Sequence, residues 1–289
     1  AKVEDTKQLR KELQEVKKLA RERAKAVTLR IPQLKDCKRH FDKKKGKGRG
    51  SMIFLCEGQS AAGSIVSCRD VETQAIFVLK GKPLNVWDLK RDIVYKNDEM
   101  YNLMRSLDIE DNIEGLRYEK VILATDADVD GLHIRNLMIT YFFRFFEQVI
   151  HDGHLFVLET PLFRVRNKTE TIYCYSEAER DSAAAKLGGG RGTDVPPVRA
   201  QGPADGSGGS AKDRQDARPT RGVEITRFKG LGEISPSEFK QFIGPAMRLS
   251  RVEYAPKPDA SNILSFYMGK NTPERKDYIM GNLVVTVEE

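Results

Sequence analysis

The sequence predicts an α/β fold in which a mostly parallel sheet carries helices on both faces. Three short apolar runs, at 52–56, 75–79 and 121–124, have the length of buried strands. Stretches with helical composition or spacing separate them, and each run ends in a turn of small or charged residues. Because strands that alternate with helices form parallel sheets, this order favours a layered α/β domain.

The chain before the first strand is basic. Residues 4–29 are rich in Lys, Arg, Glu, Leu and Ala and predict a helix that connects domains, with a DNA-binding helix as the alternative. Ile31-Pro32 ends this helix, and residues 42–50 predict a solvated loop, with proximity to phosphates as the alternative. The net charge is +7, but residues 1–50 hold 18 Lys/Arg against 7 Asp/Glu, so the body that follows is slightly acidic.

After the first strand, the sequence predicts helices and then a β-hairpin. Residues 57–64 form a turn that opens a helix, and 98–107 predict a helix with one apolar face. A strongly apolar helix is expected from about 133 to 150. Residues 155–166 and 171–175 predict the two arms of a β-hairpin.

The last third of the chain changes character twice. Residues 188–222 contain 9 Gly and 4 Pro and no aromatic residue, which predicts disorder, and helical segments are expected from there to about residue 282. The predicted organisation is a connecting helix and basic loop at 1–49, an α/β domain with a hairpin extension at 50–187, the insert at 188–222, and a helical C-terminal tail region at 223–289 that packs on the α/β domain.

Composition excludes several classes of protein. No apolar stretch reaches the ~20 residues that span a bilayer, and the charged opening of the chain argues against a signal peptide. The four cysteines form no C-x-x-C pair, which argues against a zinc ribbon and a disulfide framework. This cysteine usage favours a reducing, cytoplasmic location.

Carboxylates follow two of the predicted strands. Glu57 ends the first strand, and Asp126, Asp128 and Asp130 alternate directly after the third. Because parallel strands end at a common edge of the sheet, we expect these four side chains to converge. Like charges at this spacing repel unless a cation lies among them, and oxygen ligands suit Mg²⁺. The sequence therefore predicts a divalent-cation site at this edge.

Three known arrangements share the D-x-D pattern. A calcium-binding EF-hand needs Glu at its twelfth position, where this chain has Leu137, and a helix rather than a strand before the loop. The phosphatases of the haloacid dehalogenase type place D-x-D-x-[T/V] after the first strand of their domain, whereas two predicted strands precede Asp126 here. The toprim arrangement combines a Glu after one strand with a D-x-D after a later one, as Glu57 and Asp126 do.

Four motifs resemble the B subunits of bacterial type IIA DNA topoisomerases. Residues 57–64 (EGQSAAGS) resemble E-G-D-S-A-x-G-S, with Gln59 in place of the usual Asp. Residues 79–85 (LKGKPLN), 125–135 (TDADVDGLHIR) and 228–233 (FKGLGE) resemble three further signatures of that family in the same order. The resemblance extends over nearly the whole chain apart from the Gly/Pro-rich segment, and implies a toprim domain. It does not settle the choice between gyrase and topoisomerase IV.

The family resemblance implies an ATP-hydrolysing type II topoisomerase that cuts both strands of a DNA duplex and reseals them. The attacking tyrosine would belong to an A-type partner subunit in an A2B2 heterotetramer. This chain would be a fragment without the ATPase domain, so that ATP concerns only the full-length protein. The implied cofactor is Mg²⁺, with Mn²⁺ or Ca²⁺ as substitutes for binding, and the implied partners are DNA and the A-type subunit, with no membrane.

The resemblance also assigns the metal ligands. Glu57, Asp126 and Asp128 would be catalytic and hold Mg²⁺, and Asp130 would support a second metal position. Two other functions remain open on the residues alone. One is a non-catalytic DNA- or subunit-interaction module with a structural ion, and the other is a stand-alone toprim nuclease or primase.

Basic residues near these carboxylates receive roles in the same way. Lys80, Lys82 and Lys229 would contact DNA near the metal, with ordinary solvated lysines as the alternative. His133 and Arg135 open the helix after the aspartates. They would support the carboxylates, and a purely structural role for His133 is the alternative.

Overall fold

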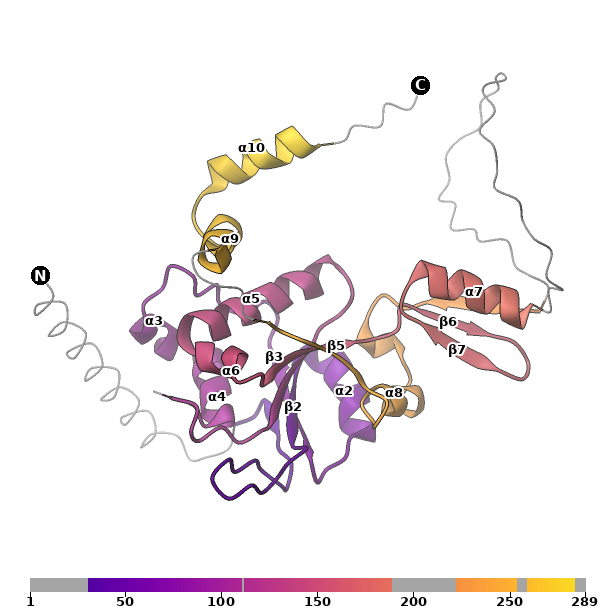
Figure 1. The fold of residues 1–289 in the computed structure, drawn as a ribbon, viewed down its shortest axis with the longest axis horizontal. Helices are drawn as coiled ribbons and strands as arrows, with labels where there is room; N and C mark the ends of the chain where they lie inside the picture. Colours follow the sequence, from indigo (N-terminus) through magenta and orange to yellow (C-terminus); the bar gives the residue numbers. More distant parts are fainter. Residues whose placement is uncertain (1–30, 111, 189–221, 254–258, 284–289) are drawn as a thin grey trace, which may run out of the picture. The chain divides into compact units, whose positions relative to one another are not determined.

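The structure is a computed structural model that describes residues 31–110, 112–188, 222–253 and 259–283 (Figure 1). The helix expected at 4–29 and nearly all of the segment expected to be disordered at 188–222 lie outside these ranges. The chain divides into two compact units, Ala1–Glu159 with Gly230–Glu289, and Thr160–Lys229. The predicted domain boundaries stay a prediction.

The first unit contains a six-stranded sheet in which four central strands are parallel and both edge strands are antiparallel. This arrangement confirms the mostly parallel sheet, and the three apolar runs are all strands. Across the sheet the order is β1 (Leu34–Lys35), β3 (Gln74–Leu79), β2 (Met52–Glu57), β4 (Lys120–Ala124), β5 (Leu155–Glu159) and β9 (Arg248–Arg251).

The register of the central strands aligns their carboxyl ends. Glu57 pairs with Leu79 of β3, and Cys56 pairs with Ala124, the last residue of β4. The strands are apolar on both faces, with Ile53, Phe54 and Leu55 fully buried in succession, because helices cover both sides of the sheet. Side chains that follow β2, β3 and β4 therefore emerge at one common edge.

Two groups of helices cover the sheet (Figure 1). On one face lie α3 (Arg91–Lys96), α4 (Asp98–Leu107), α5 (Val129–Phe145) and α6 (Glu147–His151), which share a core with alternate residues of the strands. On the other lie α2 (Gly58–Cys68) and α8 (Pro236–Phe242), which pack on each other. The predicted helix at 98–107 is confirmed, and Asn97 caps it by accepting hydrogen bonds from two backbone N–H groups.

The helix expected from about 133 to 150 differs at both ends. α5 begins at Val129 because the Asp128 side chain accepts a hydrogen bond of 2.8 Å from the Gly131 N–H and so caps the helix four residues earlier. It ends at Phe145, since Phe146 has the non-helical angles φ −140° and ψ 47°. The rest of the apolar segment forms the separate helix α6.

The segment 155–166, expected to be one arm of a hairpin, forms two strands instead. β5 belongs to the large sheet, whereas β6 (Phe163–Arg166) lies in the second unit between β7 (Thr171–Cys174) and β8 (Glu224–Arg227). Pro161 separates β5 and β6 and cannot donate to a ladder. The hairpin of β6 and β7 itself is confirmed.

The second unit has a small core of its own under its three-stranded sheet. α7 (Glu177–Leu187) is capped by Ser176, whose side chain accepts from the Glu179 N–H, and this helix covers the sheet. Phe163, Val165 and Leu187 are among the buried residues that hold helix and sheet together.

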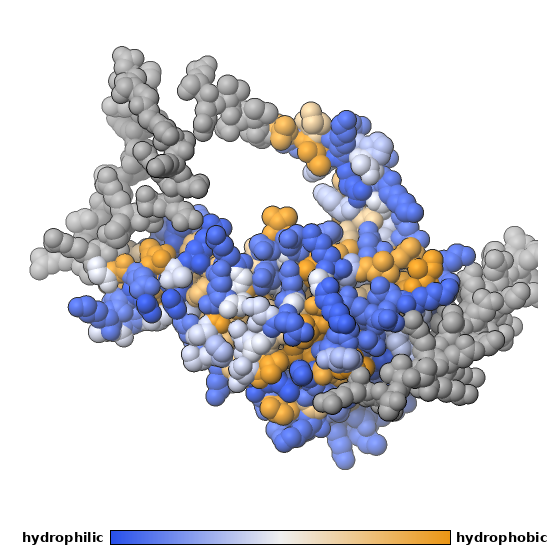
Figure 2. Space-filling model, turned by 180° about the vertical axis from the view of Figure 1, so that it is seen from behind, coloured by the Kyte–Doolittle hydropathy of each residue, from blue (hydrophilic) through white to orange (hydrophobic). Residues whose placement is uncertain are grey.

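The C-terminal region adds an edge strand and helices to the first unit. β9 pairs with β5, and the 3₁₀ turn η1 (Leu231–Glu233) precedes α8, where a capping box and Pro236 set the helix start. Two more helices follow, α9 (Asp259–Met268) and α10 (Thr272–Asn282). The end of α10 is exposed and apolar (orange in Figure 2). Among the described residues, no helix has both the length and the apolar character to cross a membrane.

Candidate metal centre

The fold brings Glu57 close to the aspartates that follow β4. Glu57 is the last residue of β2, and Asp126 lies two positions after the end of β4, the neighbouring parallel strand. Burial, followed by the charges of Asp126 and Asp128, raises the pKa of the Glu57 carboxyl. The parallel register of β2 and β4 places Glu57 and the residues after Ala124 at one edge of the sheet, as the sequence predicts.

One oxygen of this group has no partner. Glu57 Oε2 is buried and has no hydrogen bond to any residue that the structure describes. Burial likewise raises the pKa of Asp126, and the charges of Asp128 and Glu233 add to the effect, although the Leu231 N–H opposes it. An unpaired buried carboxylate oxygen is costly, and a hard cation with oxygen ligands relieves both the desolvation and the repulsion. The donor set therefore fits Mg²⁺.

Among the described residues, no three of the carboxylates Glu57, Asp126, Asp128 and Asp130 have ligand atoms that all lie within 4.8 Å of one another. In the part of the chain that the structure covers, one group of three ligand-type side chains has its ligand atoms all within 4.8 Å of one another, and it is Asp36, Cys37 and His40. Glu57, Asp126 and the neighbouring aspartates are farther apart.

Asp128 and Asp130 have different surroundings from Asp126. Both are exposed, and Asp128 is already engaged as the cap of α5. The Lys82 ammonium lies 2.7 Å from Asp130 Oδ1. Its hydrogen bond and charge, with a smaller effect of His133, lower the pKa of Asp130. Lys82, predicted to contact DNA, is thus paired with the carboxylate predicted to support a second metal.

The other basic residues of the prediction differ from one another in burial and in their contacts. The Lys80 backbone N–H donates to Glu99 Oε1 at 2.6 Å, which fixes the turn before Lys82, while its side chain is exposed. Arg135 is half-buried, its Nε has no partner among the described residues, and burial lowers its pKa. Lys229 is the last residue of the second unit and is exposed.

A segment without a role in the sequence-based prediction touches the site. The Leu231 N–H donates to Asp126 Oδ1 at 2.8 Å, from 105 positions along the chain. Around it, a Cβ added at Gly230 would lie 2.5 Å from Asp126 Oδ2, and one added at Gly232 would lie 2.5 Å from Ser60 Oγ. The signal in the sequence was the pair of glycines in FKGLGE, which permits this close approach.

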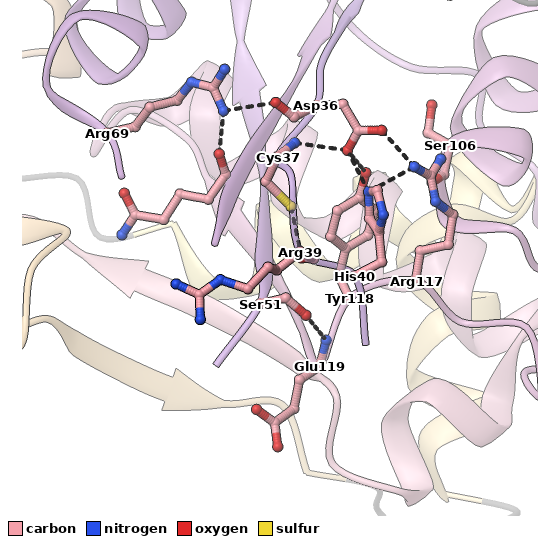
Figure 3. A network of polar contacts seen from close by, with 11 residues as sticks. Asp36, Cys37, Arg39, His40, Ser51, Arg69, Ser106, Arg117, Tyr118 and Glu119 are labelled. Carbon is pink, nitrogen blue, oxygen red and sulfur yellow. Dashed lines mark hydrogen bonds and ion pairs between the residues drawn. The ribbon is translucent and has the colours of Figure 1, made fainter. Parts of the chain in front are cut away.

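The cluster of Asp36, Cys37 and His40 lies at the opposite edge, beside the start of β4 (Figure 3). The Asp36 carboxylate accepts hydrogen bonds from Arg117 Nη2 at 2.5 Å and from the Tyr118 hydroxyl at 2.6 Å. Burial, with the Asp36 charge, raises the pKa of the Cys37 thiol to about 11. Because a guanidinium already neutralises Asp36 and the thiol stays protonated at neutral pH, this cluster is an ion-paired clasp between β1 and β4 rather than a metal site.

The basic loop at 42–50 is also at the far edge. Lys43 pairs with Asp152 at 3.1 Å and Lys44 with Glu114 at 3.0 Å. The loop precedes β2, so the length of that strand, on the order of 20 Å, separates it from Glu57. These lysines are therefore solvated and ion-paired at the amino ends of the strands, away from the carboxylates.

Comparisons with known proteins agree with this architecture. The family model of the toprim domain matches residues 52–160, and the model of the DNA gyrase B subunit carboxyl terminus matches residues 220–280. The first range contains Glu57 and the aspartates, and the second contains the Gly230–Glu233 segment that contacts Asp126.

Relatives match over most of the chain. The B subunit of DNA topoisomerase 4 from Borreliella burgdorferi is 50% identical over 284 residues, which cover 98% of this chain and 42% of that protein. The B subunit of DNA gyrase from Treponema denticola is 34% identical over 238 residues, covering 80% of this chain and 33% of that protein. The chain thus spans less than half the length of these relatives.

A solved structure shares the fold. The DNA-binding, cleavage and re-ligation domain of Plasmodium falciparum topoisomerase II matches with a TM-score of 0.64 and 23% identity, covering 90% of this chain and 33% of that one. At this identity the match supports the fold alone. The two family models and the relatives that match along the chain show that it belongs to the B subunits of the bacterial type IIA DNA topoisomerases, with their toprim domain and C-terminal region.

Proposed function

We propose that this chain forms the Mg²⁺-binding part of a DNA cleavage site and acts with an A-type subunit whose tyrosine attacks the DNA. The observation that carries this proposal is the buried, unpaired Oε2 of Glu57 beside Asp126, at the carboxyl ends of two adjacent parallel strands. The names of the relatives support DNA as the substrate and a topoisomerase reaction as the activity.

The chemistry assigned to the carboxylates follows from their positions. Glu57, Asp126 and Asp128 would hold the catalytic Mg²⁺, which when bound neutralises negative charge on the scissile phosphate and its 3′ oxygen. Burial and like charges favour the protonated form of Asp126 and also of Glu57, the residue that ends β2. Glu57 is therefore suited to return a proton to the 3′ oxygen when the DNA is resealed.

The three lysines of the prediction would contact DNA. Lys80 and Lys82 follow β3 at the same edge and are exposed, and Lys229 precedes the segment that contacts Asp126. Asp130 would accept a second cation once Lys82 is drawn to a phosphate. His133, close enough to Asp130 to influence its carboxyl, would keep that side chain in place.

Properties of the whole protein belong to the same proposal. An A2B2 assembly, ATP hydrolysis by the full-length protein and a cytoplasmic location are expected from the family resemblance. This chain spans 42% and 33% of the two relatives compared.

The direct experiment measures cation binding and DNA cleavage in the same variants. Mg²⁺ binding to the chain is followed by calorimetry, and cleavage and religation are followed with the full-length protein and its A-type subunit. Glu57→Gln and Asp126→Asn are expected to abolish both. Glu114→Gln, which removes an exposed carboxylate paired with Lys44, is the matched control and is expected to leave both unchanged.

The same experiment separates the other two functions. If the Glu57 and Asp126 variants lose cation binding but still cleave and reseal DNA with the partner, the ion is structural and the chain is an interaction module. If the chain cleaves DNA without any tyrosine-bearing partner, it is a nuclease. Either result contradicts the proposed role.

A further inference from the structure

The segment Gly230–Glu233 gives Asp126 a hydrogen-bond donor from 105 positions along the chain. Leu231 donates its backbone N–H to Asp126 Oδ1 at 2.8 Å. The donor is held in place, because the Leu231 side chain is only 2% exposed and the segment closes its own turn through the bonds Glu233 N–H to Gly230 O and Ile234 N–H to Leu231 O. The carboxylate is thus tied to a rigid element of the C-terminal region.

Gly230 leaves the space in which the Asp126 carboxylate lies. A Cβ at this position would come within 2.5 Å of Oδ2 and 3.0 Å of Cγ of Asp126. The backbone angles of Gly230, φ −145° and ψ 163°, are extended and open to any residue. The requirement for glycine therefore comes from the carboxylate and not from the backbone. Alanine at this position would have to push the flexible end of Asp126 aside.

We propose that Gly230 and Leu231 are positioning residues for the metal centre, in which the Leu231 N–H and the missing Cβ of Gly230 together fix the orientation of the Asp126 carboxylate. This inference rests on the proposed function in one respect, that Asp126 binds a cation. Partners that orient a ligating side chain typically contribute roughly 10–100-fold to metal affinity.

A coupling between two regions of the chain follows. A cation on Asp126 and the docking of the segment Gly230–Glu233 favour the same carboxylate orientation, so each stabilises the other by the same factor. Mg²⁺ should therefore slow hydrogen exchange of the Leu231 amide and protect the segment, although no residue of that segment is required as a ligand.

The chain offers a matched pair of variants for the test. Gly230→Ala and Gly232→Ala lie two residues apart, and each adds one methyl group. In both, the added carbon would lie 2.5 Å from a side-chain oxygen. The first methyl group meets Asp126 and the second meets Ser60. A general disturbance of the segment affects both variants, whereas displacement of the metal ligand affects only the first.

The measurement is Mg²⁺ affinity of the whole chain by calorimetry without DNA, with thermal unfolding in EDTA as the test of folding. We expect affinity about tenfold weaker for Gly230→Ala and within about twofold of the parent for Gly232→Ala. Equal affinity in Gly230→Ala and the parent, or an equal loss in both variants, overturns the positioning role. Asp126→Asn tests the proposed function separately, since unchanged binding there removes Asp126 as a ligand whatever Gly230→Ala does.

A second variant removes the hydrogen bond itself. Replacing Leu231 by its α-hydroxy acid, through nonsense suppression, converts the amide to an ester and deletes the N–H while keeping the buried side chain. Weaker Mg²⁺ binding by several-fold is the expected result. Unchanged Mg²⁺ affinity together with lower thermal stability in EDTA would show a contact that serves folding alone, and would overturn the role of this N–H.

Discussion

Lys82 Nζ lies 2.7 Å from Asp130 Oδ1, so a lysine after β3 neutralises an aspartate at the start of α5. The two side chains are 52% and 64% exposed, which makes the pair easy to open. Because Lys82 holds the carboxylate that would receive a second cation, it competes with that cation. The pair therefore limits the charge repulsion of the cluster when no cation is bound.

Lys82→Met should strengthen binding of a second divalent cation. Removal of the competing ammonium leaves Asp130 fully available, and we expect affinity for Mn²⁺ to rise by a small factor, on the order of threefold. Titration of the chain with Mn²⁺, followed by electron paramagnetic resonance, measures this directly. Lys96→Met, at an exposed lysine paired with Asp92 on α3, is the control. Weaker Mn²⁺ binding in Lys82→Met would contradict the competition.

The carboxylate cluster predicts how stability without metal depends on pH. Burial and like charges raise the pKa values of Glu57 and Asp126, so the folded chain binds more protons than the unfolded chain at pH above the usual carboxyl range of about 4. The contribution of these two carboxylates to stability in EDTA should therefore become more favourable as the pH falls from 7 toward that range.

Glu57→Gln should weaken this dependence, because the neutral amide carries no charge to bury. In EDTA at pH 7 the variant is expected to be at least as stable as the parent, and with Mg²⁺ less stable than the parent. Urea unfolding of the parent and of Glu57→Gln, each with and without Mg²⁺, gives four curves of stability against pH. The opposite result would be a parent that loses more stability in EDTA than Glu57→Gln between pH 7 and pH 5. That result would contradict the raised pKa of Glu57.

Asp36 should show the opposite dependence on pH. Burial alone would raise its pKa, but hydrogen bonds from Tyr118 and His40 and the charge of Arg117 outweigh this effect and lower it. The stabilisation is present above the pKa of an unfolded aspartate, about 3.9, and is lost as the pH falls through the lower folded value.

Asp36→Asn is expected to cost about 1–2 kcal/mol at pH 7, because it removes charge-assisted hydrogen bonds at a partly exposed site. The difference from the parent should shrink in acid. Chemical unfolding at pH 7 and below pH 4 measures it. Since this clasp lies at the far edge of the sheet, Mg²⁺ affinity should not change, and a large loss of affinity would refute the structural role assigned to Asp36.

Gly131→Ala should disrupt the turn that carries the aspartates. A Cβ at Gly131 would lie 2.2 Å from the backbone oxygen of Asp126, which cannot move without moving the turn. We expect lower thermal stability and loss of Mg²⁺ binding together. Gly63→Ala on α2, where a Cβ meets nothing within 4 Å, is the control and should be tolerated. Normal Mg²⁺ affinity in Gly131→Ala would show that the turn tolerates displacement.

Local patterns in the sequence predicted the strands and the residues that follow them. The runs at 52–56 and 121–124 are buried strands because an uninterrupted apolar run fits a sheet covered on both faces. Parallel pairing then placed Glu57 and Asp126 at one edge. The predicted start of α5 was wrong by four residues, since Asp128 is both a candidate ligand and the helix cap, and the spacing of apolar residues reports neither role.

By itself the sequence determined the α/β class, the strands whose ends gather the carboxylates, and the motifs of the type IIA B subunits, because these depend on residues close together along the chain. Only the tertiary structure decided that Leu231 holds Asp126, that Lys82 faces Asp130, and that β9 closes the sheet beside β5. Such contacts join residues far apart in sequence. Packing and burial determine these contacts, and the spacing of residues along the sequence does not predict them.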